Sequence, residues 1–399
     1  MKRTLVWLMA ASTGLIVANI YYIQPLLADI AREFGLSVAS VAVVAMMTQI
    51  GTALGMLFFV PLGDKYERRA LITALLAAAT VALALVAMAR SVVWLAAASL
   101  AVGATASTVQ VIVPFAAHLA PERERGRIVG TVLGGLLVGI LLARTFSGVL
   151  GARFGWRAVY AVGAVAMLGL AALLRLALPV SRPAEPVSWG ELMRSIARLV
   201  REQRVLRESA LIAGILFFSF TALWTTIVFV LRTPPYHYGT TAAGLFGLLG
   251  AGSAAAAPIV GRLSDRHGPE RAILTAIVTA LAGYVLLLLF GKTLAGLVLA
   301  IILIDVGVQA GHVANQSRIY ALIPAARSRL NTFYMVAFFI GGSAGSYLGP
   351  FGWNAWGWLG FCGCPLVALV FATGYFGSRG LRGSFVGQPR TAPNTLSSS

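Results

Sequence analysis

Residues 70–118 read ALITALLAAATVALALVAMARSVVWLAAASLAVGATASTVQVIVPFAAH, and this stretch decides the fold. Two apolar runs, 70–89 and 92–118, are separated only by Arg90 and Ser91. Each run is long enough to cross the hydrocarbon core as a helix, which needs about 20 apolar residues. A connection of two residues leaves no room for soluble structure, so the stretch predicts a membrane-spanning helical hairpin.

The composition extends this prediction to the whole chain. Of the 399 residues, 59% are hydrophobic and 11% are charged, whereas a soluble domain is about 25% charged. A soluble enzyme is therefore excluded, and long runs without alternation exclude a β-barrel. We predict an all-α membrane protein with twelve transmembrane helices, at 5–27, 38–62, 70–89, 92–118, 127–151, 156–178, 209–231, 241–261, 272–291, 294–317, 330–352 and 355–377.

The basic residues indicate the orientation. A net charge of +18 would point to nucleic acid in a soluble protein. Here, with the N-terminus in the cytoplasm, 24 of the 31 Lys and Arg residues fall inside, six fall outside, and Arg144 lies within a span. The positive-inside rule then predicts a multi-pass protein of the cell inner membrane with both termini cytoplasmic, and no nucleic-acid partner. We interpret the N-terminus as the first span and not as a cleaved signal peptide.

A basic polar stretch divides the spans six and six. It predicts an N-terminal six-helix bundle over 1–178, a cytoplasmic linker over 179–207, a C-terminal six-helix bundle over 208–377 and a disordered cytoplasmic tail over 378–399. Within the linker, apolar residues recur at three- and four-residue steps opposite arginines, which predicts an amphipathic helix on the anionic inner leaflet. A plain tether whose arginines only set the orientation is the alternative.

The two halves resemble each other at a nearly fixed offset. Asp64, after the second span, matches Asp265, after the eighth, at an offset of 201. Gln110 and His312 match at 202, as do Gly155-Trp156 and Gly357-Trp358. These matches predict a duplicated six-helix unit, and such parallel repeats are typical of secondary transporters.

The loops that contain Asp64 and Asp265 resemble a signature of the major facilitator superfamily, G-x-L-x-D-R-x-G-R-R/K. They read LGDKYERR at 62–69 and GRLSDRHGPER at 261–271, and only the second copy keeps both glycines. The resemblance implies two pseudo-symmetric six-helix bundles and a cytoplasmic gating motif. A charge cluster that merely orients the loops is the alternative. The gating residues implied are Asp64, Arg68, Gly261, Asp265, Arg266, Gly268 and Arg271.

Within that superfamily, the stretches 19–27 and 315–331 resemble the bacterial arabinose-efflux and drug:proton antiporter branch. The glycines of the fifth span, at 130–139, resemble a motif of proton-coupled antiporters. A fourth-span Arg-x-x-Gln-Gly motif of drug antiporters is missing from this chain, so no proton route is carried over from it.

Asp305 is the acidic residue that lies well inside a predicted span, about half-way across. Burying a carboxylate there is costly, which makes it a functional candidate by default. Steps of 4, 3 and 4 residues place Gln309, His312 and Gln316 on the same helical face. We predict that Asp305, Arg144 and His312 couple transport to protons. A static ion pair between Asp305 and Arg144, or a plain interhelical hydrogen bond of His312, is the alternative.

Other polar residues in the spans are candidates to contact substrate in a central cavity. Interhelical hydrogen bonding is the alternative for each of them. Cys362 and Cys364 have no ligand partners nearby, so we expect no metal site, and we expect no cofactor either. The substrate-cavity candidates are Asn19, Tyr22, Gln110, Gln309 and Gln316.

These features predict a secondary active transporter, not an enzyme, that exports a small drug-like or sugar-like molecule by proton antiport with alternating access. Its expected partners are the substrate, protons and the lipid bilayer, and we expect a monomer. A P-loop is absent from the sequence, so ATP is not the predicted energy source. A proton-coupled uptake symporter of a small metabolite remains an alternative, and a non-transporting membrane receptor is a second one.

Overall fold

A computed structural model of the chain describes residues 3–181, 189–250, 268–323 and 326–383. The side chains at 64 and 379–383 lie outside this description. The described residues form helices and short connections, with no strand among them. The predicted all-α class is therefore confirmed.

The first half of the chain folds into long helices joined by tight connections. These are α1 (Arg3–Tyr21), α2 (Ile23–Phe34), α3 (Val38–Phe58), η1 (Val60–Asp64), α4 (Arg68–Ala87), α5 (Val92–Ala106), α6 (Val109–Leu119), η2 (Glu122–Glu124), α7 (Arg125–Phe154) and α8 (Trp156–Ala177).

The second half begins with a short amphipathic helix and continues with further long helices. These are α9 (Trp189–Glu202), α10 (Arg204–Val230), α11 (Thr240–Phe246), η3 (Gly247–Leu249), α13 (Pro269–Phe290), α14 (Leu294–Tyr320) and α15 (Arg327–Gly383).

Ten helical segments of the described residues are long and apolar enough to cross a membrane. One of them, Arg327–Ser378, contains both of the last two predicted spans, which meet where Gly357 adopts a positive φ of 56°. The predicted eighth span begins at Thr240–Leu249, and its remainder falls in 251–267, outside the described residues. The described helices thus agree with the twelve-span prediction. The predicted tail falls largely in 384–399, which also lies outside the described residues.

Short polar residues fix several helix starts. Ser91 accepts a hydrogen bond from the backbone N–H of Trp94 at 3.3 Å, and Thr293 accepts one from Gly296 at 3.2 Å. Such caps satisfy N–H groups that have no partner within the helix. Ser91 therefore helps the four residues 88–91 to reverse the chain between α4 and α5.

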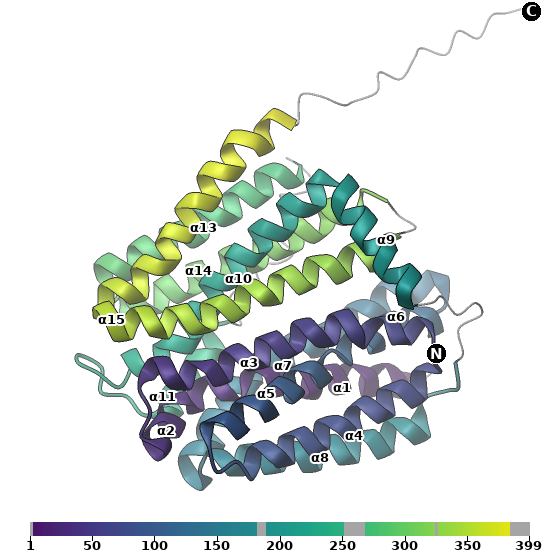
Figure 1. Ribbon diagram of the computed structural model, residues 1–399, viewed down its shortest axis with the longest axis horizontal. Coiled ribbons are helices and arrows are strands. Elements are labelled where there is room, and N and C mark those ends of the chain that lie inside the picture. The colour runs from purple at the N-terminus through teal and green to yellow at the C-terminus, as the bar shows by residue number, and fades with distance from the viewer. Residues whose placement is uncertain (1–2, 182–188, 251–267, 324–325, 384–399) are drawn as a thin grey trace, which may run out of the picture.

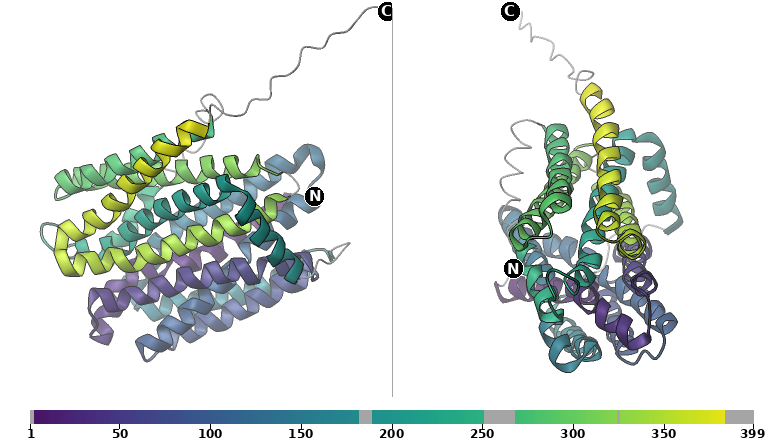
Figure 2. Two further views of the ribbon diagram at one scale, coloured as in Figure 1. Left: turned by 45° about the horizontal axis from the view of Figure 1, so that its top comes forward. Right: turned by 90° about the vertical axis from the view of Figure 1, so that its left-hand side faces the viewer.

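The helices of the two halves lie in separate groups (Figure 1, Figure 2). Helices α1–α8 occupy one side, and α10, α13, α14 and α15 occupy the other, while α11 lies against α7 and α2 of the first group. The groups touch where α3 packs on α15, α7 on α11 and α2 on α10. The N-terminus and α9 lie at one end of the molecule, called here the α9 end, while α2 and α11 lie at the opposite, α11 end.

Glycines at corresponding positions allow equivalent pairs of helices to pack closely in the two halves. A Cβ atom at Gly139 of α7 would collide with the backbone of Gly14 in α1. In the second half, a Cβ atom at Gly341 of α15 would collide with Gly214 of α10 in the same way. Gly139 and Gly341 differ by 202 positions, the offset of the sequence repeat. The repeat is thus visible as shared backbone contacts.

Candidate functional site

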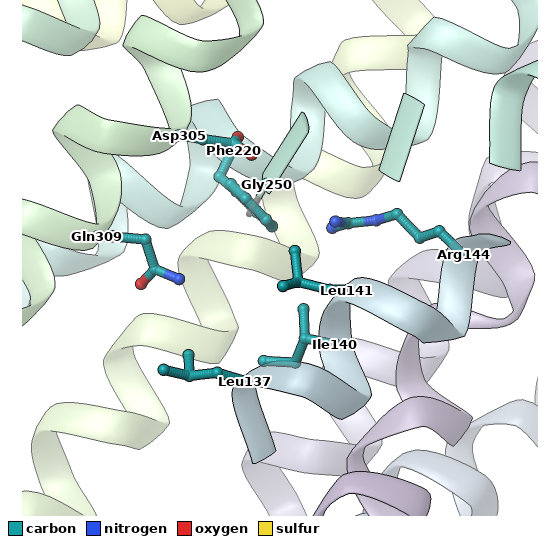
Figure 3. Close-up of a pocket in the computed structure, with 8 residues that line it drawn as sticks. All are labelled: Leu137, Ile140, Leu141, Arg144, Phe220, Gly250, Asp305 and Gln309. Carbon is teal, nitrogen blue, oxygen red and sulfur yellow. The ribbon is translucent and has the colours of Figure 1, made fainter. Parts of the chain in front are cut away.

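Arg144 of α7 and Asp305 of α14 face a small pocket between the two halves (Figure 3). Their side chains are only 2% and 1% exposed. The pocket has a volume of about 20 Å³, and apolar side chains form most of its wall. Its lining residues are Leu137, Ile140, Leu141, Arg144, Phe220, Gly250, Asp305 and Gln309.

Aromatic rings and one amide hold the guanidinium of Arg144. Nε donates a hydrogen bond to Oε1 of Gln24 at 2.6 Å. The guanidinium carbon lies 4.0 Å from the ring centroid of Trp224, 5.1 Å from that of Tyr21 and 5.3 Å from that of Phe220. These cation–π contacts offset part of the lost hydration. Nη2, in contrast, is buried and has no hydrogen-bond partner among the described residues.

Trp224 of α10 connects Arg144 to Asp305. Its indole N–H donates a hydrogen bond to Oδ1 of Asp305 at 3.0 Å, while its ring faces the guanidinium. The described residues form seven ion pairs, and Arg144 and Asp305 take part in none of them. The static ion pair considered from the sequence is therefore not formed in this conformation. The two charges are separated by an aromatic ring instead.

The polar face of α14 divides between different environments. Gln309 lines the central pocket beside Asp305. Nδ1 of His312 lies 3.0 Å from the hydroxyl of Tyr334, which makes the interhelical hydrogen bond considered as the alternative for this residue. Gln316 lies further along, where its Nε2 donates to Asn331 at 3.4 Å.

A second cavity, of about 390 Å³, lies between the halves toward the α9 end. Gln110 lines it, whereas the other substrate candidates do not. The charged residues among its described lining are Arg68 and Arg327, both basic. The lining residues are Met56, Val60, Gly63, Arg68, Gln110, Val111, Val113, Pro114, Tyr320, Arg327, Ser328, Asn331, Thr332 and Met335.

Asn19 and Tyr22 are buried within the first half. The ring of Tyr22 lies 5.8 Å from that of Phe146 and 6.4 Å from that of Tyr160. Asn19 is 3% exposed, and its Oδ1 has no hydrogen-bond partner among the described residues. Neither residue lines the central pocket or the cavity of about 390 Å³. Packing within the first half accounts for Tyr22 in this conformation.

Much of the predicted gating motif lies outside the described residues, namely the side chain of Asp64 and all of Gly261, Asp265 and Arg266. The backbone N–H of Arg68 donates to the carbonyl of Ser181 at 3.1 Å, and its side-chain Nε donates to Gly63 at 3.4 Å. Gly268 has a φ of 83° at the start of α13, and Arg271 is exposed. The predicted gating role of these residues stays a prediction.

Glu67 occupies a position where the family signature has glycine. Its carboxylate accepts hydrogen bonds from the backbone N–H groups of Arg69 and Ala70, both at 2.9 Å, and from Ser181 at 3.3 Å. Burial raises the pKa of Glu67, but these three donors and the charge of Arg69 outweigh it and hold the pKa below its ordinary value of 4.5. Glu67 therefore caps α4 and fastens the chain that follows α8.

A polar cluster that the sequence analysis missed joins the halves at the α11 end. Nη2 of Arg232 donates to Oδ1 of Asp29 and to the hydroxyl of Thr240, both at 2.7 Å. Thr240 in turn donates to Oδ2 of Asp29 at 2.6 Å. Arg232 is one of the six basic residues that the orientation places outside. The sequence does hold a signal for this pair, because the acid Asp29 and the base Arg232 follow corresponding spans of the two halves.

A second missed cluster lies inside the second half, near the α9 end. Arg318 is 8% exposed, and its guanidinium lies 3.3 Å from carboxylate oxygens of both Glu208 and Glu270. Arg204 also pairs with Glu208, at 2.7 Å. These contacts tie α10, α13 and α14 together. In the sequence these residues lie at the ends of predicted spans. Charged residues are common there, so nothing in the sequence indicates that these form a buried cluster.

Helix α9 touches both halves of the molecule. Trp189 stacks on Phe58 of α3 with ring centroids 5.8 Å apart and an interplanar angle of 10°. Ser195, on the same helix, accepts a hydrogen bond from Arg329 of α15. In this conformation α9 therefore lies across the α9 end of the interface and not apart from the bundles.

Two groups of membrane-spanning helices with a polar pocket between them form the architecture of a membrane transporter. A family profile agrees with this class: the Major Facilitator Superfamily profile matches residues 9–346 and 236–394. The chain belongs to the Major Facilitator Superfamily. It is thus a multi-pass membrane protein of a transporter family, and no catalytic function is indicated.

Individual relatives agree with this assignment. The chain is 38% identical over 372 residues to the putative uncharacterized transporter YgaY of Escherichia coli strain K12, covering 93% of this chain and 94% of the relative. It is 27% identical over 293 residues to a chloramphenicol resistance protein of Streptomyces lividans, covering 70% of each. Among solved structures, a bacterial homologue of the lysosomal transporter Spinster, in an inward-facing and unoccupied conformation, superposes with a TM-score of 0.76 and 16% identity, covering 93% of this chain and 95% of that one.

Proposed function

We propose that the protein exports a small organic molecule in exchange for protons, by alternating access. The observation that supports this most strongly is the environment of Asp305. Its carboxylate is 1% exposed at the interface between the halves, and one indole N–H is its hydrogen-bond donor. A buried carboxylate whose nearby opposite charge, Arg144, makes no direct ion pair with it is costly, so closing the halves around it favours a bound proton or a bound substrate group.

The arrangement of the two ends supports this mechanism. By the positive-inside rule, the α9 end faces the cytoplasm. The halves are joined at the α11 end by Asp29, Arg232 and Thr240, while a cavity of about 390 Å³ lies between them toward the α9 end. This is an inward-facing arrangement, in which substrate enters from the cytoplasm and a proton on Asp305 is released there.

A similar protein supports export as the direction of transport. A chloramphenicol resistance protein is among the proteins similar to this chain. Removing a toxic compound from the cytoplasm requires outward transport, and the inward proton gradient of a bacterium supplies the energy. A single carboxylate that binds either a proton or substrate couples the two movements, because each must leave before the other binds.

Everted membrane vesicles test the proposal, with chloramphenicol, arabinose and compounds selected by a toxicity screen in a host lacking its own pumps as probes. Respiration acidifies the vesicle interior, and a pH-sensitive dye reports the interior pH. A substrate of an antiporter should make the interior more alkaline, and Asp305→Asn should abolish this response. Undiminished proton flux in Asp305→Asn would show that Asp305 is not the coupling residue.

The controls use matched carboxylates and the sign of the response. Asp305→Glu keeps the acid and should retain part of the flux. Glu124→Gln removes an exposed acid that pairs with Arg127 at 2.8 Å and should leave the flux unchanged. An uptake symporter would acidify the interior on substrate addition, and a receptor would give no flux. Either result with a bound compound contradicts antiport.

A further inference from the structure

The central pocket exposes one unused donor and one unused acceptor, contributed by opposite halves. Nη2 of Arg144, from the first half, is buried and has no hydrogen-bond partner in the part of the chain that the structure describes. Asp305, from the second half, accepts the indole N–H of Trp224 on Oδ1, and no hydrogen bond to Oδ2 is found among the described residues. Both side chains line the same pocket and point toward it (Figure 3).

A water molecule alone does not balance this site. A volume of about 20 Å³ has room for one water. Water would satisfy the hydrogen bonds, but it would leave the opposite charges of Arg144 and Asp305 facing each other across the pocket without direct contact. A buried guanidinium whose nearest contacts are aromatic rings and one amide remains costly, and the ligand that balances it best is an anion. The same reasoning assigns a cation to the ionised carboxylate of Asp305.

The backbone of Gly250 keeps the space beside Asp305 open. A Cβ atom at Gly250 would lie 2.9 Å from Cδ2 of Leu141 and 3.5 Å from Oδ2 of Asp305. A methyl group there would occupy the space in front of the carboxylate. The remaining walls are mostly apolar, so the two charges and the amide of Gln309 supply the polar recognition.

The polar face of α14 runs from the pocket toward the cavity at the α9 end. Gln309 lines the pocket, and Tyr320 lines the larger cavity. Gln316 lies between them, one helical turn before Tyr320 on the same face. The pocket and the cavity of about 390 Å³ therefore lie along the same face of α14, and separation of the halves would join them.

From these contacts we infer that the transported molecule is a compact zwitterion, such as an amino acid, which binds when the halves move apart and enlarge this pocket. Its carboxylate then binds Nη2 of Arg144, and its ammonium group binds Oδ2 of Asp305. This inference rests on the proposed function and names its substrate class. One molecule then bridges the two halves through opposite charges. Its ammonium group and a proton compete for the same carboxylate, so binding of substrate displaces the proton, as exchange requires.

Binding to the purified full-length protein in nanodiscs, without a proton gradient, tests the substrate class. The probes are the twenty amino acids, each compared with its analogue lacking the amine and its analogue lacking the carboxylate, such as leucine, 4-methylpentanoate and 3-methylbutylamine. At least one zwitterion should bind about tenfold or more tightly than both of its analogues, because each analogue loses a hydrogen bond between charged groups. Equal binding by a single-charge analogue, or no zwitterion binding, would overturn the inference.

Variants separate the two charges. Arg144→Gln should reduce affinity for the zwitterion to that of the amine analogue, and Asp305→Asn should reduce it to that of the carboxylate analogue. Gly250→Ala leaves both charges in place but fills the pocket, so it should weaken binding about tenfold or more while the protein stays monodisperse. Arg127→Gln, at an exposed pair, is the matched control and should bind normally. Normal binding by Gly250→Ala would place the ligand elsewhere.

Binding in nanodiscs and proton flux in everted vesicles together distinguish this inference from the proposed function. If a zwitterion binds through both charges but produces no proton flux in everted vesicles, proton exchange is wrong and the substrate class stands. If a neutral or cationic compound drives proton flux through Asp305 while zwitterions do not bind, exchange stands and the substrate class is wrong.

Discussion

Asp29 of α2 and Arg232, just after α10, form an ion pair of 2.7 Å that joins the two halves of the chain at the α11 end. Their side chains are 26% and 20% exposed, and Thr240 hydrogen-bonds to both. Because the partners belong to different halves, the pair must separate whenever this end opens. It therefore contributes to the balance between the two conformations of an alternating-access cycle.

Breaking this pair should shift the balance toward the conformation open at the α11 end. A partly exposed ion pair contributes about 1 kcal/mol or less, so Asp29→Asn should raise the open fraction by about two- to fivefold. Spin labels at Ala152 and Gly239, which line the groove at this end, would report a longer distance. Glu33→Gln is the control, because Glu33 pairs with Arg157 inside the first half. A shift of the same size in Glu33→Gln would mean that loss of a negative charge at this end, and not loss of the Asp29–Arg232 pair, changes the balance.

Trp224 should be needed for more than packing. Trp224→Phe keeps a ring against Arg144 but removes the hydrogen bond to Asp305, whereas Trp224→Leu removes both. We expect slower exchange in the first variant and no measurable exchange in the second. A cation–π contact is worth about 0.5–2 kcal/mol, so Trp224→Leu should also unfold at a lower temperature than Trp224→Phe. Thermal unfolding and vesicle flux check both effects, and equal flux in the two variants would contradict the role of the ring.

The spans could be predicted from the sequence because membrane crossing depends on local length and hydrophobicity. The stretch 70–118 shows this well, since its two helices, separated by a Ser91 cap, follow from the residues alone. Asp305 could be singled out for the same reason, as a costly charge in an apolar run.

The surroundings of Asp305 could not be predicted in this way. Gln24 and Arg144 are 120 positions apart, and Trp224 and Asp305 are 81 apart. No local periodicity reports which faces of distant helices meet. For Asn19 and Tyr22, polarity in a span suggested the cavity, but the helix is turned so that Tyr22 packs against α7 and α8. Helix rotation is set by tertiary packing, which a single sequence does not display.

Glu67 should stabilise the folded protein in a pH-dependent manner. Its pKa is lowered in the folded state, so its stabilising effect is fully present above the unfolded value of 4.5 and is lost as the pH falls through the lower folded value. Replacing a capping residue typically costs about 0.5–2 kcal/mol. Glu67→Ala should therefore melt below the wild type at pH 7, and the difference should shrink below about pH 4.5. Thermal unfolding of the detergent-solubilised protein between pH 3.5 and 7 measures this difference. A difference that persists unchanged at the acidic end would mean that the carboxylate charge is not the cause.

Gly139 should be intolerant of any side chain. The Cα atom of Gly139 lies directly against the backbone of Gly14. A methyl group would therefore force α1 and α7 apart, because the backbone atoms it meets cannot rotate away. Overpacking of this kind costs about 1–3 kcal/mol, and Gly139→Ala should lower the unfolding temperature accordingly. Gly169 of α8 is the matched control, because it is exposed and no described atom lies within 4 Å of a Cβ built there. Gly169→Ala should be neutral or slightly stabilising, since alanine favours the helix by up to about 1 kcal/mol. If both variants melt alike, the close approach of α1 and α7 does not limit stability, and the glycine at 139 would instead reflect a need for the two helices to slide during transport.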